Sequence, residues 1–65
     1  MEEFIVFDNK RQGYIAYINQ YDGEIDYTTY KEEAQIYRSI GGWKKFFEDW
    51  NQLKPGENRW RLCNL

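Results

Sequence analysis

The chain contains no histidine and a single cysteine, Cys63. Without histidine it lacks the commonest general base and metal ligand, and one cysteine cannot complete an ordinary zinc site. Cys63 also has no partner for an intramolecular disulfide, whereas small secreted domains usually contain several. No base stands near Cys63 in the sequence to activate it as a nucleophile. We therefore expect no metal, no cofactor and no thiol chemistry.

Long hydrophobic runs are also missing. The N-terminal apolar run spans only residues 4–7, and a membrane-spanning helix needs about 20 apolar residues. A signal peptide would begin with basic residues, but this chain begins with Glu2 and Glu3 after the initial methionine. From these absences we expect a soluble, cytoplasmic protein without a membrane partner.

Aromatic residues, in contrast, are abundant and make up 20% of the 65 residues. A chain of this length buries only about 60% of the surface that its unfolded form exposes, so its core is small. Each aromatic ring can bury roughly 150–250 Å², which compensates for the short chain. We predict one small folded domain over residues 1–65.

The charges are unevenly divided along the chain, although the net charge at pH 7 is only −2. Residues 1–33 contain eight acidic and three basic residues, a balance of −5. Residues 34–65 contain three acidic and six basic residues, a balance of +3. Such a division can arise by chance, or it can support self-association or a polarised binding surface.

Three strands are predicted in the first half. Residues 4–7 and 14–18 are rich in β-branched and aromatic side chains, and the segment between them has the length of a hairpin loop. Asp22 and Gly23 mark a tight turn, because glycine tolerates the positive φ that such turns require. Residues 24–28 then alternate polar and apolar side chains, as a half-buried strand does.

The second half has a helical period. Thr29 and Glu32 fit a capping box, which predicts a short helix ending near residues 39–42. A second helix is predicted for residues 43–50, whose sequence is WKKFFEDW. At 100° per residue its aromatic rings fall within an arc of about 100°, with the charges on the other side. The rings could form a ligand platform, but a helix in so small a domain needs this stripe for the core.

The chain is expected to finish with a turn at residues 55–58 and a strand at residues 59–63, with Trp60 and Leu62 pointing inward. The predicted fold is therefore α+β. Three N-terminal strands and one C-terminal strand form a small antiparallel sheet, and two helices pack on one face. The order of the strands cannot be predicted from the sequence.

The only carboxylate cluster is formed by Asp22, Glu24 and Asp26. Paired carboxylates can transfer protons or hold a divalent cation, but the solvated face of a strand explains the same pattern more simply. The glycine pair at residues 41–42 lacks the flanking residues of a phosphate-binding loop. We therefore predict no catalytic residues and a protein that is not an enzyme.

The first two predicted strands are apolar on both faces, which an antiparallel sheet with one solvated face would not require. If helices cover one face, the other is an exposed apolar patch, and such a patch usually marks an interface. Alternatively, the first helix or a loop covers it, or the tyrosines only present hydroxyls to water. The partner would be a second copy of the chain or a different protein. The predicted partner-binding residues are Ile15, Tyr17, Tyr21, Asp22, Glu24 and Asp26.

A second hypothesis is nucleic-acid binding, with Trp60 available for base stacking. The sequence isoelectric point near 5.0 and the inward position of Trp60 in its strand argue against it. The basic residues that would carry this function are Lys44, Lys45, Arg59, Arg61 and, in addition, Lys54.

The order of features over residues 13–62 gives a further indication. A hairpin is followed by a Thr-led segment with Glu-Ala at residues 29–34, an aromatic Tyr37, Ser39, an amphipathic helix and a closing strand. This layout resembles many small phage and prophage accessory proteins, although Trp43 departs from it where a small residue is usual. The resemblance implies an acidic, cytoplasmic protein that binds and blocks a host protein, as anti-defence and anti-CRISPR inhibitors do. Our main prediction is such a protein-binding module.

Overall fold

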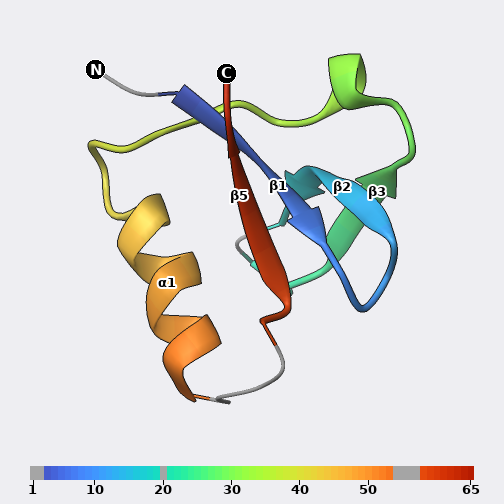
Figure 1. The fold of residues 1–65 in the computed structure, drawn as a ribbon. Helices are drawn as coiled ribbons and strands as arrows, with labels where there is room; N and C mark the ends of the chain where they lie inside the picture. Colours follow the sequence, from blue (N-terminus) through green and yellow to red (C-terminus); the bar gives the residue numbers. More distant parts are fainter. Residues whose placement is uncertain (1–2, 20, 54–57) are drawn as a thin grey trace.

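The computed structural model describes residues 3–19, 21–53 and 58–65. Within these ranges the chain forms an α+β fold with one antiparallel sheet of five strands and one α-helix (Figure 1). The helix α1 is Trp43–Leu53, and a short 3₁₀ turn, η1, is Lys31–Glu33. The strands are β1 Glu3–Asp8, β2 Gly13–Ile18, β3 Ile25–Thr28, β4 Tyr37–Arg38 and β5 Trp60–Asn64.

The antiparallel sheet and the α+β class are confirmed, and each of the four predicted strands overlaps an observed one. The sequence reasoning missed β4. Gly23 has the positive φ expected of a turn residue, 76°. The turn predicted at residues 55–58 lies, except for Asn58, outside the described residues.

Strand β1 is the centre of the sheet because it pairs with three other strands. It pairs with β5 from Phe4 opposite Asn64 to Asp8 opposite Trp60. Its opposite edge is shared: β2 pairs with Phe7 and Asp8, whereas β4 pairs with the other end of β1. Because two strands share one edge, β2 and β4 diverge from each other beyond their contacts with β1.

A β-bulge at Ala16 changes which side chains of β2 enter the core. Ile15 pairs with Tyr27, but the next pair joins Tyr17 to Asp26, so Ala16 is an extra residue without a partner on β3. The bulge puts Ile15 and Ile18 both on the core side, whereas Tyr17 remains 54% exposed. A regular strand would instead place Ile15 and Tyr17 on the same face.

The first of the two predicted helices is wrong. The chain makes only the 3₁₀ turn η1, and Ala34 is already extended, with ψ of 144°. The Thr28 hydroxyl, not that of Thr29, accepts from the backbone N–H of Tyr30 and donates to the Glu33 carboxylate. A helix of this length is marginal in isolation, so pairing of β4 with the vacant edge of β1 outweighs the local preference.

The second predicted helix is confirmed as α1, and its rings face the core. Phe47 is 1% exposed and its ring lies 5.3 Å from that of Trp60 and 5.8 Å from that of Tyr37. Phe46 lies at the margin of the stripe and is 45% exposed. No helix in the described part of the chain is long and apolar enough to cross a membrane. The core residues are Phe4, Val6, Ile15, Tyr37, Phe47 and Trp60.

The second face of β1 is not open, contrary to the expected apolar patch. Ile5 is 1% exposed, and Ala34, Ile36 and Leu65 lie around it. The backbone N–H of Leu65 donates to the carbonyl of Glu3, which ties the end of the described chain to this strand. The loop that was the alternative explanation thus covers this face, because the segment after η1 crosses it on the way to β4.

Candidate protein-binding surface

The divergence of β2 from β4 leaves an open groove of about 440 Å³ between them. One wall is the end of β2, and the other is the segment from β4 to the start of α1. The groove exists because both strands share one edge of β1 and then separate. It is lined by Tyr17, Ile18, Gln35, Ile36, Tyr37, Arg38, Ile40, Gly41 and Trp43.

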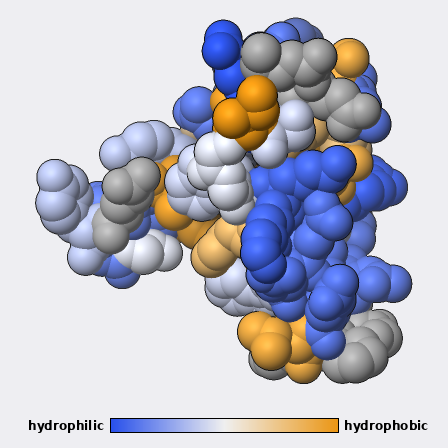
Figure 2. Space-filling model, turned by 90° about the vertical axis from the view of Figure 1, so that its left-hand side faces the viewer, coloured by the Kyte–Doolittle hydropathy of each residue, from blue (hydrophilic) through white to orange (hydrophobic). Residues whose placement is uncertain are grey.

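Apolar side chains around this groove are unusually exposed. Tyr17 is 54%, Ile36 is 50% and Ile40 is 70% exposed. On the side of the molecule shown in Figure 2, hydrophobic atoms lie between a lobe that projects to the left and a hydrophilic surface to the right. Two exposed isoleucines beside one hollow form an apolar surface that is suited to a protein partner.

The inner part of the groove is built from well-packed aromatic rings. Tyr37 is 6% exposed, and its ring centre lies 5.3 Å from that of Trp43. Burial raises the pKa of the Tyr37 hydroxyl to about 12, so this side chain stays neutral at physiological pH. The inner part of the groove is therefore formed by packed rings, of which Tyr37 is uncharged near neutral pH.

The glycine pair at the end of this wall has a backbone role. Gly41 and Gly42 have φ of 119° and 87°, a region that L side chains rarely adopt. This conformation reverses the chain direction between Ile40 and the first turn of α1, where Phe46 N–H bonds to the Gly42 carbonyl. The sequence GG thus lets Ile40 and Trp43 line the same groove.

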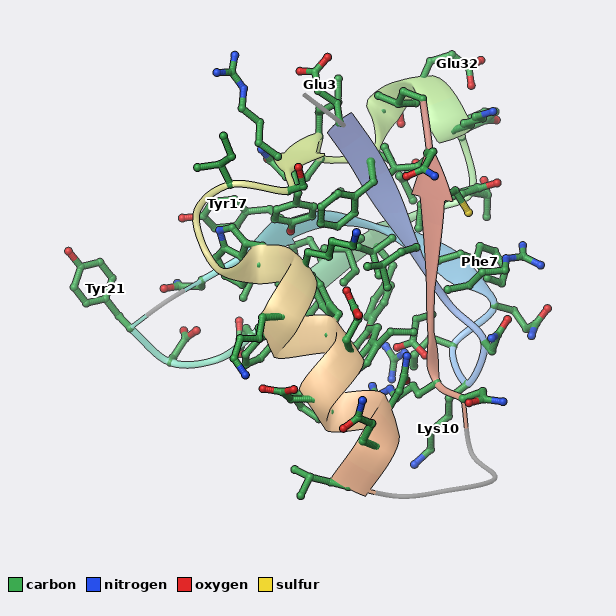
Figure 3. All side chains as sticks on the ribbon, turned by 60° about the vertical axis from the view of Figure 1, so that its left-hand side comes forward. Glu3, Phe7, Lys10, Tyr17, Tyr21 and Glu32 are labelled. Carbon is green, nitrogen blue, oxygen red and sulfur yellow. The ribbon has the colours of Figure 1, made fainter. Side chains whose placement is uncertain are left out.

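The loop between β2 and β3 projects next to the groove. Tyr21 is fully exposed and points away from the body of the molecule (Figure 3). The loop is nevertheless held by local bonds, because Asn19 N–H donates to the Glu24 carbonyl and the Asp22 carboxylate accepts from Glu24 N–H. Tyr21 N–H also donates to the Asn19 side chain.

Most of the predicted partner-binding residues lie on this side, but Ile15 does not. Ile15 is fully buried in the core and cannot contact a partner, and the bulge at Ala16 is the reason that Tyr17 does not share its side of the sheet. Tyr17 lines the groove, and Asp26 lies opposite it on β3. Tyr21, Asp22 and Glu24 belong to the adjacent loop. Within the described residues, no group of histidine, cysteine, aspartate and glutamate could hold a metal ion.

The basic residues of the nucleic-acid hypothesis are not brought together on one surface. Lys45 pairs with Asp49 along α1 at 3.0 Å, and Lys44 lines a different hollow beside Glu48. Arg61 lies over the Phe7 ring, on the face of the sheet opposite the core. Arg59 is bound to the buried Asp8. Lys54 lies outside the described residues.

The sequence reasoning also missed a buried polar cluster around Asp8. The Asp8 carboxylate is fully buried, and Arg59 donates to it from Nε at 3.1 Å and from Nη2 at 3.0 Å. The Tyr27 hydroxyl donates to it at 2.7 Å, and two backbone N–H groups of the β1–β2 loop, of Lys10 and Arg11, complete its shell. Alternation along β1 puts Asp8 on the core face with Val6, which could have signalled an ion pair.

The titration of this cluster follows from its geometry. Burial acts to raise the pKa of Asp8, but the hydrogen bonds from Arg59, Tyr27 and Lys10 outweigh it and lower the pKa below 3.8. The pKa of Tyr27 is raised, by burial and by its bond to the Asp8 anion. The cluster therefore holds one fixed ion pair at neutral pH and joins β1, β3 and the start of β5.

The groove was missed because its residues were assigned to the helix that does not form. Ile36 and Ile40 are four residues apart, which is also the spacing of one helix face.

A scan of protein-family models and searches of curated proteins and solved structures found no match to this chain.

Proposed function

We propose that this protein is a non-enzymatic protein-binding module and that the groove between β2 and β4 is its binding surface. The observation that carries this proposal is the exposure of Tyr17, Ile36 and Ile40 around one open hollow. Exposed apolar residues that surround a hollow are typical of a surface that another protein covers. The acidic loop beside the groove adds charge selectivity at its rim.

We propose no catalytic role because the buried polar residues already bond to one another. Both oxygens of the buried Asp8 accept hydrogen bonds from Arg59. Tyr27 and backbone N–H groups occupy further acceptor sites, so this cluster has no position for a substrate. The acidic residues of the loop are exposed, where proton transfer gains little from the protein environment.

The form of this function that the sequence layout suggests is inhibition of a larger host protein, of the phage anti-defence type. In such an inhibitor a small rigid domain covers a functional surface of its target. A preformed groove and a locally bonded loop fit this role, because a rigid surface loses little conformational entropy on binding. The sequence layout that suggests this role includes the segment around Thr29, which is not an α-helix in the structure. The main support for an inhibitor is therefore the exposed apolar surface.

The test uses Ile40→Asp, which puts a charge in the apolar surface without touching the core. The matched control is Leu53→Asp at the other end of α1, because Leu53 is 81% exposed. Each variant and the wild-type protein are immobilised and exposed to a cytoplasmic extract of the source cells, and their own solution mass is measured. A partner, or self-association, that is lost only in Ile40→Asp supports the proposal. Binding that is unchanged in Ile40→Asp contradicts it.

A further inference from the structure

Acidic residues lie beside one wall of the groove, and the other wall contains a basic residue. Residues 19–30, which include the loop behind the β2 wall, contain three acidic residues and no basic one. The other wall lies within residues 35–43, whose one charged side chain is the basic Arg38. An apolar surface between an acidic and a basic side is complementary to a second copy of the same surface.

The charges nearest the groove show how this match would work. Asp26 lies directly opposite Tyr17 in the β2–β3 pairing, and Arg38 lines the facing wall. Arg38 also approaches Glu3, but at 3.9 Å with both side chains at least half exposed. So loose a pair on the surface contributes little energy, and Arg38 remains available to a stronger partner.

We propose that the groove is occupied by a second copy of this chain, related to the first by a two-fold axis through the apolar residues. Rotation by 180° places the acidic side of one copy against the basic side of the other, so that Asp26 faces Arg38 of the second copy and the reverse. Tyr17, Ile36 and Ile40 of both copies then cover each other. Closed two-fold dimers are the commonest assembly of identical chains, and each contact in them is made twice.

The self-complementary charge decides for a second copy over an unrelated protein. A second copy supplies the matching charge for both residues at once, because Asp26 and Arg38 lie on opposite sides of the same hollow. A second copy also extends the small core that a chain of this length can build. This inference rests on the proposed function, because it names the partner of the same surface.

The experiment exchanges the two charges between chains. Asp26→Lys alone and Arg38→Glu alone each place like charges against each other twice in a homodimer. We expect either change to weaken dimerisation by about tenfold or more. In an equimolar mixture of the two variants, both contacts of a mixed dimer again join opposite charges. Native mass spectrometry distinguishes the mixed dimer from the two homodimers by mass.

The expected result is a wild-type mass near twice 8.0 kDa at high concentration, a loss of dimer in each variant and recovery in the mixture only. Glu32→Lys and Lys10→Glu are the controls, because Figure 3 places both residues away from Tyr17. Both controls should dimerise like the wild type. Circular dichroism verifies that every variant is folded.

Three results overturn the inference. A wild-type mass of 8.0 kDa at all concentrations excludes the second copy. Dimers that persist in both single variants, or a mixture that does not recover, exclude this arrangement of the two copies. If the wild type is monomeric and binds a different protein, and Ile40→Asp abolishes that binding, the proposed function stands. Only the inference that the partner is a second copy is then wrong. If Ile40→Asp changes neither mass nor partner binding, both fail.

Discussion

Arg59 holds the carboxylate of Asp8 from two of its nitrogen atoms, although the two residues are separated by most of the sequence. The Asp8 side chain has no solvent exposure, and that of Arg59 is only 23% exposed. The guanidinium also lies 4.5 Å from the centre of the Trp60 ring. This contact therefore joins the end of β1 to the start of β5 by charge and by packing.

Replacing Asp8 by Asn should destabilise the fold by about 3 kcal/mol, because it leaves a largely buried Arg59 without its anion. Urea denaturation followed by tryptophan fluorescence measures this change. The control is Glu3→Gln, which removes the exposed partner of Arg38 and should cost less than about 1 kcal/mol. Equal losses in the two variants would show that the buried pair is not special.

The unfolding free energy should fall in acid because of Asp8. Its pKa in the folded protein is lower than the unfolded value of 3.8, so its contribution is fully present above that pH. It is lost as the pH falls through the lower folded pKa. Urea midpoints measured from about pH 5 to pH 2 should therefore converge for the wild type and Asp8→Asn. A constant difference between them over this range would contradict the lowered pKa.

Asn51 should matter more than its partly exposed position suggests. Its side chain accepts from Trp60 N–H at 3.0 Å and donates to the Trp60 carbonyl at 2.8 Å, which fixes α1 to β5. Asn51→Ala should cost about 1–3 kcal/mol, because it leaves both buried backbone groups unpaired. Hydrogen exchange of the Trp60 amide should accelerate in this variant. The exposed neighbour Gln52→Ala should change the free energy of unfolding by less than about 0.5 kcal/mol.

Phe47 is the ring of α1 on which the core depends most. Phe47→Ala should cost about 3–5 kcal/mol and bring so small a domain close to unfolding. Phe47→Leu keeps much of the volume and should remain folded, with a loss below about 2 kcal/mol. Leu53→Ala is the control, because Leu53 is 81% exposed. Thermal unfolding and near-ultraviolet circular dichroism measure these effects, and an unchanged melting temperature in Phe47→Ala would contradict this core.

The fold could be predicted where local pattern and long-range pairing agree. The side-chain periods of β3, β5 and α1 predicted these elements, and β1 and β2 were predicted from their β-branched and aromatic content, so none of them needed tertiary information. The segment after Thr29 is different, because its sequence suits a helix while β1 has a vacant edge that requires a strand. Only the structure shows that β2 pairs with no more than Phe7 and Asp8, and hence that Tyr37 is needed there.

The candidate surface could be predicted only in part for the same reason. Tyr17 and the acidic loop were predicted as partner-binding residues, because the second strand is apolar on both faces and the acidic turn follows it. Ile15 was wrongly included, because no sequence pattern reveals the extra residue Ala16 that puts Tyr17 on the outer face while Ile15 stays inward. Ile36 and Ile40 were missed, because their place on the groove wall depends on β4 and on the reversal at the glycine pair.

The pairing of β1 with β5 affects when the sheet can form during synthesis of the chain. A ribosome delivers the N-terminal strand first, and its apolar residues remain without one of their two neighbours until residues 60–64 emerge. Folding therefore cannot be completed during most of synthesis, and contacts so distant in sequence form slowly. During that interval the edge of β1 that later pairs with β5 has unpaired backbone groups, and such an edge can pair with another chain.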